Sequence, residues 1–280
     1  MRMMTQLSEQ YPVKEICKIF MITRSSYYYY HQRLGYCCPE RERLKAKAID
    51  IHANSRGAAG SRTIAGMLTQ SGDKVGRDKA SRLMKEANLV SKPFKRHRYK
   101  PVGIASTIAP NRLNRQFTVK HANQIWCGDV TYVWAGTHWC YLALVMDLYA
   151  RRIVGWAYST SPDSQLTIKA LRMAYESRQP DKGLLFHSDQ GCHYTSIDYQ
   201  QQLWCYQMTQ SISRKGNCWD NAPMERVFRT FKKDWMPELG YRTYPQAQYD
   251  IMQFIHYYNQ QRGHSYNHYL TPAQAEIQSR

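Results

Sequence analysis

Three carboxylates occupy positions where a charged group needs a physical reason. Asp129 lies in the middle of residues 124–135, a run rich in aromatic and β-branched residues that predicts a strand. Asp189 comes shortly after the apolar run 184–186, and Glu225 lies near the start of a predicted helix that has a proline in its first turn. An ionised carboxylate is costly to bury in such places unless it is paired or bound to a metal ion.

If the three carboxylates meet, a cation must separate their charges. Hard divalent ions with oxygen ligands suit this role, Mg²⁺ before Mn²⁺. Two such ions about 3.5–4 Å apart can activate an attacking oxygen and stabilise the leaving oxygen of a phosphodiester. Simpler alternatives remain open for single acids: Asp189 could cap a turn before Gly191. Asp147, at another predicted strand end, could form an ion pair with Arg151 or Arg152.

The elements that must position these acids follow from the apolar patterns. Three closely spaced strands over 124–135, 137–149 and 151–159 predict an antiparallel meander. A helix, a strand, a helix, a strand and a further helix follow, over 161–178, 184–188, 195–205, 206–213 and 221–235. This order predicts an α/β domain with a mixed sheet, the ribonuclease-H-like fold. In that topology the first and fourth strands are neighbours, so Asp129 and Asp189 can converge. Val227, Phe231 and Trp235 would pack the last helix on the sheet.

The charge is distributed unevenly along the 280-residue chain, whose formal net charge is +18. Residues 1–120 contain 24 Lys and Arg against 8 Asp and Glu, whereas residues 121–280 contain 15 against 13. A strongly basic first part indicates a polyanionic partner, and basic residues interleaved with tyrosines and turns favour nucleic acid over a membrane surface.

Residues 40–90 predict a helix-turn-helix. Ile64, Met67 and Leu68 share one face of its first helix, and a turn over 71–76 follows. The second helix would bury Ala80, Leu83 and Met84 and present basic residues to the DNA major groove: Arg77, Lys79, Arg82 and Lys85. The alternative is a plain helical hairpin with a solvated basic face. The following basic segment predicts a tether along DNA phosphates through Lys92, Lys95, Arg96, Arg98 and Lys100.

The same patterns predict the domain organisation and the compartment. We expect an all-α N-terminal segment (1–38), the helix-turn-helix region (39–90), a basic linker (91–121), the catalytic core (122–240) and a C-terminal helical extension (241–280). No apolar run of about 18 residues and no secretion signal occur, which favours a cytoplasmic, nucleoid-associated protein. The eight cysteines form no CxxC pair and are expected as free thiols; a zinc site at Cys37 and Cys38 near His31 is the weaker alternative.

Four segments together resemble a known family: 126-WCGDVTYV-133, 146-MDLYARRIVGWAYS-159, 186-FHSDQGCHYTS-196 and 213-SRKGNCWDNAPMERVFRTFKKD-234. They are similar to the DDE integrase core of bacterial insertion-sequence transposases, in particular the second-frame (orfB) product of the insertion sequence three family. The 35 residues between Asp189 and Glu225 match that family's spacing, and 257-YYNQQRGHSYNHYLTPAQ-274 resembles its C-terminal ending.

The resemblance implies a Mg²⁺- or Mn²⁺-dependent DNA strand transferase that uses a pair of ions held by Asp129, Asp189 and Glu225. It also implies double-stranded DNA, both element ends and target, as substrate, and a homo-oligomer when active. Arg229, Lys232 and Lys233 are expected to hold DNA near the metals. Because residues 1–50 contain no heptad zipper, the upstream-frame product is expected as a fusion or partner. The alternatives are a non-catalytic DNA-binding regulator and an RNA-degrading nuclease on the same fold.

Overall fold

The computed structural model describes residues 2–33, 38–92 and 108–278, in two compact units that span residues 1–47 and 48–280. In the first unit, the small helices α1 (Arg2–Leu7), α2 (Val13–Ile19) and α3 (Arg24–Arg33) bury Met4, Ile16, Cys17 and Tyr27. Thr23 begins α3, since its Oγ1 accepts from the Ser26 N–H at 3.2 Å. Four consecutive tyrosines occupy positions 27–30; Tyr27 is buried, whereas Tyr28 and Tyr29 are exposed.

A helix-turn-helix follows α4 (Pro39–Asn54). Helix α5 (Ser61–Gln70) buries Ile64, Ala65 and Leu68, and α6 (Arg77–Glu86) buries Ala80, Leu83 and Met84. The turn between them contains Gly72 at φ +93°, in the left-handed region that glycine adopts without strain. The predicted apolar faces are therefore the buried ones, except that Met67 is only half-buried.

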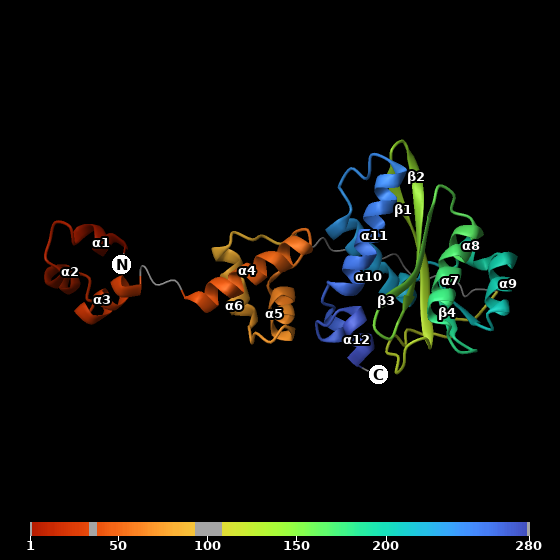
Figure 1. Ribbon diagram of the computed structural model, residues 1–280, viewed down its shortest axis with the longest axis horizontal. Helices are drawn as coiled ribbons and strands as arrows, with labels where there is room; N and C mark the ends of the chain where they lie inside the picture. Colours follow the sequence, from red (N-terminus) through yellow and green to blue (C-terminus); the bar gives the residue numbers. More distant parts are fainter. Residues whose placement is uncertain (1, 34–37, 93–107, 279–280) are drawn as a thin grey trace. The chain divides into compact units, whose positions relative to one another are not determined.

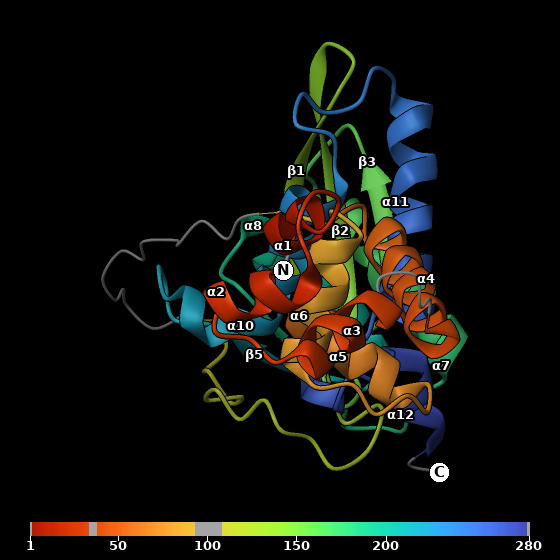
Figure 2. The ribbon, with the colours of Figure 1, turned by 90° about the vertical axis from the view of Figure 1, so that its left-hand side faces the viewer.

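A five-stranded sheet forms the centre of the second unit, in the order β3-β2-β1-β4-β5. The strands are β1 (Ile125–Ala135), β2 (His138–Asp147), β3 (Arg152–Ser159), β4 (Leu185–Ser188) and β5 (Thr209–Ile212). The first three pair antiparallel, whereas β1 with β4 and β4 with β5 pair parallel. The predicted meander and the predicted neighbours, first and fourth strand, are both confirmed. The β1–β2 hairpin extends well beyond the short strands (Figures 1 and 2).

Helices cover both faces of the sheet. On one face, α7 (Ser164–Arg178), α8 (Cys192–Thr195) and α9 (Ile197–Cys205) enclose a core around Trp126, Phe186 and Leu171. Asp163 begins α7 by accepting from the Leu166 N–H at 3.0 Å. Helix α7 lies so close to β3 that a Cβ on Gly155 would come within 2.2 Å of the Ala170 carbonyl oxygen.

The other face is covered by the C-terminal third of the chain. The elements here are η1 (Cys218–Asn221), α10 (Ala222–Thr230), the π-helical turn η2 (Phe231–Trp235), α11 (Tyr244–Gln260), η3 (Ser265–Asn267) and α12 (Pro272–Gln278). Val227, Phe231 and Trp235 all pack into this core, as the sequence predicts, and Phe254 of α11 joins them. Among the residues described, no helix is long and apolar enough to span a membrane.

Candidate active site

The strand register brings two of the three predicted acids together. Cys127 of β1 lies opposite His187 of β4 in parallel pairing, so Asp129 and Asp189 lie two residues further along neighbouring chains. Between them the sheet is tight, because a Cβ on Gly128 would come within 2.6 Å of the Phe186 ring. A glycine at this point lets the aromatic core approach the strand that carries Asp129.

The electrostatics of Asp129 reflect this crowding. Burial raises the pKa of Asp129 well above its usual range, and the nearby charges of Asp189 and Glu225 raise it further. A hydrogen bond from the Val130 N–H to Oδ1 at 2.7 Å and the charge of Lys232 oppose this rise. A carboxylate next to like charges binds a cation favourably, since the cation removes both the repulsion and the cost of burial.

Asp189 also has the simpler role that its sequence context suggests. Its Oδ1 accepts from the Gly191 N–H at 3.0 Å, which is a turn cap before α8. Burial lowers the pKa of the neighbouring His193, and Asp189 partly offsets the effect. The cap fixes the orientation of the carboxylate and leaves oxygen lone pairs for a further ligand.

Glu225 lies in the first turn of α10, where it is half-buried, and its charge acts on Asp129. The start of this helix is fixed to β1 because Asn221 Nδ2 donates to the Gly128 carbonyl at 3.3 Å. The preceding residue, Asp220, accepts from Arg214 Nη2 at 2.8 Å, from Arg115 Nε at 2.7 Å and from Asn111 Nδ2 at 3.0 Å. Although burial alone would raise it, Arg214 and Arg115 hold the pKa of Asp220 below its usual range.

His187 connects the strands beneath the acids. Its Nδ1 lies 2.8 Å from Ser211 Oγ, and its Nε2 lies 3.0 Å from both the Asp220 carbonyl and Ser213 Oγ. Burial lowers the pKa of His187 to about 4, so the ring is neutral near pH 7. Sequence reasoning missed His187, Asp220 and Asn221 as positioning residues, because all but one of their partners, Arg214, are more than 20 residues away along the chain.

The donor set fits a hard divalent cation only in part. Asp129 and Asp189 offer carboxylate oxygens on adjacent chains, the ligand type that Mg²⁺ and Mn²⁺ prefer. Over the described ranges, however, no three His, Cys, Asp or Glu side chains lie at the spacing of metal ligands. Glu225 would have to approach the aspartates to complete a three-acid site. For the zinc alternative, Cys37 lies outside the described residues, and Cys38 is a free thiol.

Of the three cations predicted to hold DNA near the acids, Lys232 is the one whose charge acts on Asp129. Burial lowers the pKa of Lys232, and the charge of Asp129 opposes this shift. Arg229 acts instead on Arg226 and on Asp234 of η2. Lys233 is exposed.

The predicted DNA-contact residues of the helix-turn-helix lie on the surface of α6. Arg77, Arg82 and Lys85 are exposed and Lys79 is half-buried. Lys92 donates from Nζ to the Asp234 carbonyl at 2.9 Å, which ties the start of the linker to η2. The remaining linker cations lie outside the described residues: Lys95, Arg96, Arg98 and Lys100.

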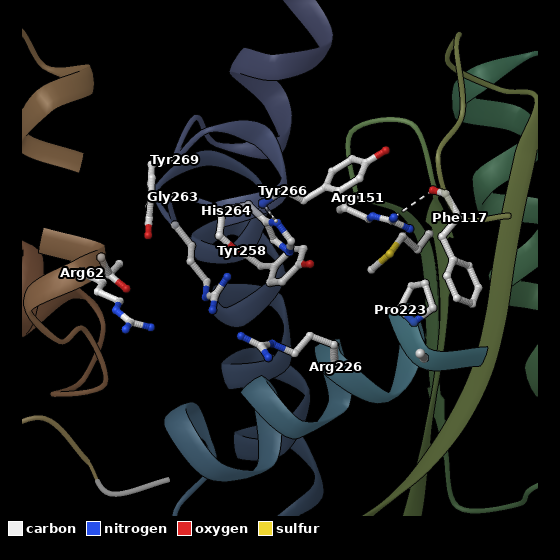
Figure 3. Close-up of a pocket in the computed structure, with 15 residues that line it drawn as sticks. Arg62, Phe117, Arg151, Pro223, Arg226, Tyr258, Gly263, His264, Tyr266 and Tyr269 are labelled. Atoms are coloured by element: carbon white, nitrogen blue, oxygen red, sulfur yellow. Dashed lines mark hydrogen bonds between the residues drawn. The ribbon is translucent and has the colours of Figure 1, made fainter. Parts of the chain in front are cut away.

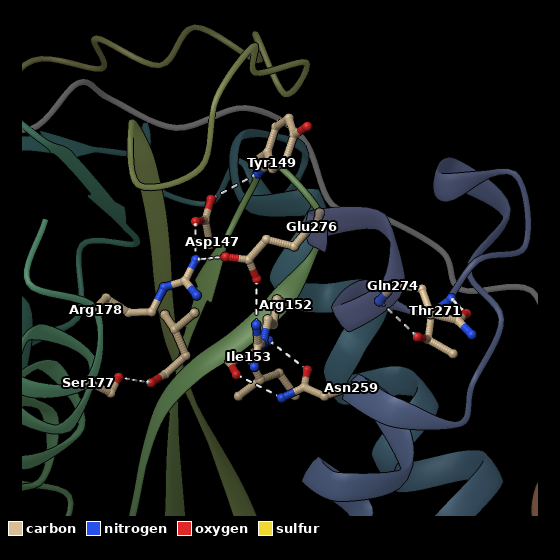
Figure 4. Close-up of polar contacts among 12 residues, drawn as sticks. Asp147, Tyr149, Arg152, Ile153, Ser177, Arg178, Asn259, Thr271, Gln274 and Glu276 are labelled. Carbon is tan, nitrogen blue, oxygen red and sulfur yellow. Dashed lines mark hydrogen bonds and ion pairs between the residues drawn. The ribbon is translucent and has the colours of Figure 1, made fainter. Parts of the chain in front are cut away.

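The predicted ion pair of Asp147 with Arg151 or Arg152 is wrong in its partner. Asp147 accepts from the N–H groups of Asn123 and Tyr149 at 2.8 and 3.0 Å, and its cation is Arg178 of α7 at 3.4 Å (Figure 4). Arg151, at φ +58° in the turn before β3, donates to the Phe117 carbonyl, and Arg152 pairs with Glu276 of α12. Asp147 is a structural acid, as expected, but its cationic partner, Arg178, lies 31 residues further along the chain.

Sheet order and sequence comparison define the class of the catalytic domain. Residues 119–218 match the family model described as an integrase core domain, and residues 206–272 match a second model with the same description. Residues 39–98 match an HTH-like domain. The chain thus combines a helix-turn-helix region with a ribonuclease-H-like integrase core.

Relatives in bacterial insertion sequences cover nearly the whole chain. The transposase for insertion sequence element IS904 of Lactococcus lactis is 33% identical over 88% of this chain and 98% of its own length. An uncharacterized 31 kDa protein of insertion element IS600 from Shigella sonnei is 36% identical over 92% and 96%. The transposase InsF for IS3A of Escherichia coli is 28% identical over 95% and 94%. The chain belongs to the IS3 family of insertion-sequence transposases.

Proposed function

We propose that this transposase cleaves and joins insertion-element ends at a site formed by Asp129, Asp189 and Glu225, with Mg²⁺ or Mn²⁺, in two copies, as the cofactor. The observation that carries the proposal is the pairing of β1 with β4, which brings Asp129 and Asp189 onto neighbouring chains; burial, and then the charge of Asp189, raises the pKa of Asp129. When bound, the ions would neutralise these acids and polarise the phosphodiester for in-line displacement.

The chain's own residues position the reactants. Asp129 and Asp189 form a fixed pair, because one is in β1 and the other is held by the Gly191 N–H. Glu225 would be the third ligand, offered from the first turn of α10. Lys232 lies near Asp129 and offers a cation to the DNA phosphate that approaches it. Water would hydrolyse the phosphodiester at an element end, which leaves a 3′-OH and a 5′-phosphate. The 3′-OH would then attack a second phosphodiester and displace the 3′-oxygen of that strand, with no covalent bond between protein and DNA.

DNA binding is assigned to two further regions. The exposed cations of α6, Arg77, Arg82 and Lys85, with Lys79, would contact the element end in the major groove. The linker cations, with Arg229 and Lys233, would contact phosphates without sequence preference. Double-stranded DNA is the substrate, a homo-oligomer is the active form, and the upstream-frame product is a fusion or partner.

The test is strand joining with labelled element-end DNA. Asp189→Asn should abolish Mg²⁺-dependent cleavage and joining while DNA binding persists. Asp181→Asn is the matched control, because Asp181 is exposed in the turn before β4, at the opposite end of the strand. Joining at wild-type rate by Asp189→Asn would refute the site. Comparing this chain with an upstream-frame fusion distinguishes a catalytic role from a purely regulatory one.

Sequence recognition has its own test. Arg82→Gln should change the ranking of DNA sequences, whereas neutralising Lys95, Arg96 and Arg98 together should weaken binding to all sequences and flatten its salt dependence. If Arg82→Gln loses the same affinity for every sequence, α6 contacts DNA phosphates and does not read bases.

A further inference from the structure

A cavity lined with arginines lies beside the start of α10. Its volume is about 520 Å³, and its lining includes Arg151, Arg226 and Arg262 together with Tyr258, His264 and Tyr266 (Figure 3). None of the described residues that line it is Asp or Glu. A concave site with several cations and no acid is suited to an anionic ligand.

Arg151 is the most buried of these cations, at 7% exposed. Its Nη2 donates to the Phe117 carbonyl at 2.8 Å, and its guanidinium lies 4.2 Å from the centre of the Tyr266 ring. Its Nη1 is buried and makes no hydrogen bond within the described part of the chain. A buried, charged N–H without an acceptor is costly, and an anionic oxygen in the cavity would satisfy it.

The other two cations repel each other. Burial lowers the pKa of Arg226, and the neighbouring charges of Arg262 and Arg229 lower it further. The negative charge of Asp234 attracts Arg226 and Arg262. The same carboxylate also attracts Lys92 and Arg229. One acid therefore faces four cations, and a phosphate would offset the remaining repulsion.

His264 adds a neutral donor to the cavity. Burial and the charges of Arg262, Arg151 and Arg226 lower the pKa of His264 to about 3. Its Nδ1 accepts from the Tyr266 N–H at 3.3 Å, so the ring proton lies on Nε2. The wall that carries this histidine is fixed, since Asn267 Nδ2 donates to the Ala150 carbonyl at 2.8 Å.

From these contacts we infer that the cavity binds one unpaired nucleotide of a DNA strand, with its phosphate held by Arg151, Arg226 and Arg262. The guanidinium fork matches phosphate oxygens, and the tyrosines offer aromatic faces to a base. The volume suits one nucleotide rather than a stacked base pair. Arg226 directly follows Glu225 on α10, so the cavity lies on the helix that carries the third proposed ligand. The inference rests on the proposed function for its DNA substrate.

The test measures binding of a labelled ten-nucleotide single strand by fluorescence anisotropy at several salt concentrations. Arg226→Gln and Arg262→Gln should each weaken binding about 10-fold and reduce the salt slope by about 0.7. Arg242→Gln is the matched control, because Arg242 is exposed before α11 and removes the same charge. Unchanged melting temperatures would show that the variants fold. Arg151 is left intact, since its contact with Phe117 is structural.

Wild-type affinity and slope in both variants would overturn the inference. Competition by deoxyadenosine monophosphate, with undiminished oligonucleotide binding in both variants, would make the cavity a site for free nucleotides and would also overturn it. Failure here is separable from failure of the proposed function. The joining assay on Asp189→Asn tests the acids alone, and the anisotropy assay needs no divalent ion.

Discussion

Asn259 of α11 takes the place of a neighbouring strand at the edge of the sheet. Its Oδ1 accepts from the Ile153 N–H at 3.0 Å, and its Nδ2 donates to the Ile153 carbonyl at 2.8 Å (Figure 4). Strand β3 has only β2 beside it, so these bonds satisfy two backbone groups of an otherwise unpaired edge. Asn259→Ala removes both partners at once.

The magnitude follows from what remains unpaired. Each buried backbone group without a partner costs about 1–3 kcal/mol, so the two groups together cost about 2–6 kcal/mol. Alanine forms helices better than asparagine does, which adds roughly 0.7 kcal/mol of stability at most. We expect a net loss of about 2–4 kcal/mol after local relaxation. At about 2–4 °C for each kcal/mol in a unit of this size, the melting temperature should fall by roughly 5–15 °C.

The assay is thermal unfolding followed by circular dichroism and differential scanning calorimetry. Gln253→Ala is the control, because Gln253 is exposed in the same helix and its replacement changes only helix propensity. A melting temperature for Asn259→Ala within about 2 °C of that control would refute the reasoning. It would show that water or a shifted backbone satisfies Ile153 without cost.

Three further outcomes follow from the same structure. Glu276→Gln should remove a contribution to the free energy of unfolding. The wild type has this contribution above about pH 4.5 and loses it as the pH falls through the pKa of Glu276 in the folded protein. Burial alone would raise the pKa of Glu276, but Arg178 and Arg152 hold it below its usual range; melting temperatures from pH 3 to 7, with exposed Glu238→Gln as control, check this. Gly155→Ala should lower the free energy of unfolding by about 1–3 kcal/mol, because the added methyl group meets the backbone of α7. Equal denaturant midpoints for the variant and the wild type would contradict this prediction. Asp220→Asn should lower stability by about 2 kcal/mol and slow joining, since it loosens the Arg115 and Arg214 contacts that hold the start of α10; joining at full rate despite lower stability would show that α10 needs no such anchor.

Element type and order could be predicted because they depend on local patterns. Alternation of apolar residues marks the strands, and the stripe Val227, Phe231 and Trp235 marks the buried side of the last helix. The neighbourhood of β1 and β4, and with it the meeting of Asp129 and Asp189, followed from strand order alone. The structure differs in one boundary: the helix predicted over 221–235 changes to a π-helical turn at Phe231.

The sequence by itself determined that one acid lies within a strand and another just after a strand, and that a basic helix-turn-helix precedes them, because charge and period are properties of short segments. Only the tertiary structure decided the partners of Asp147, the anchoring of α10 by Asp220 and Asn221, and the gathering of Arg151, Arg226 and Arg262. Arg151 and Arg262 are more than a hundred residues apart and lie on different elements. No local pattern encodes such a meeting, because it arises when helices from distant parts of the chain pack on one sheet face.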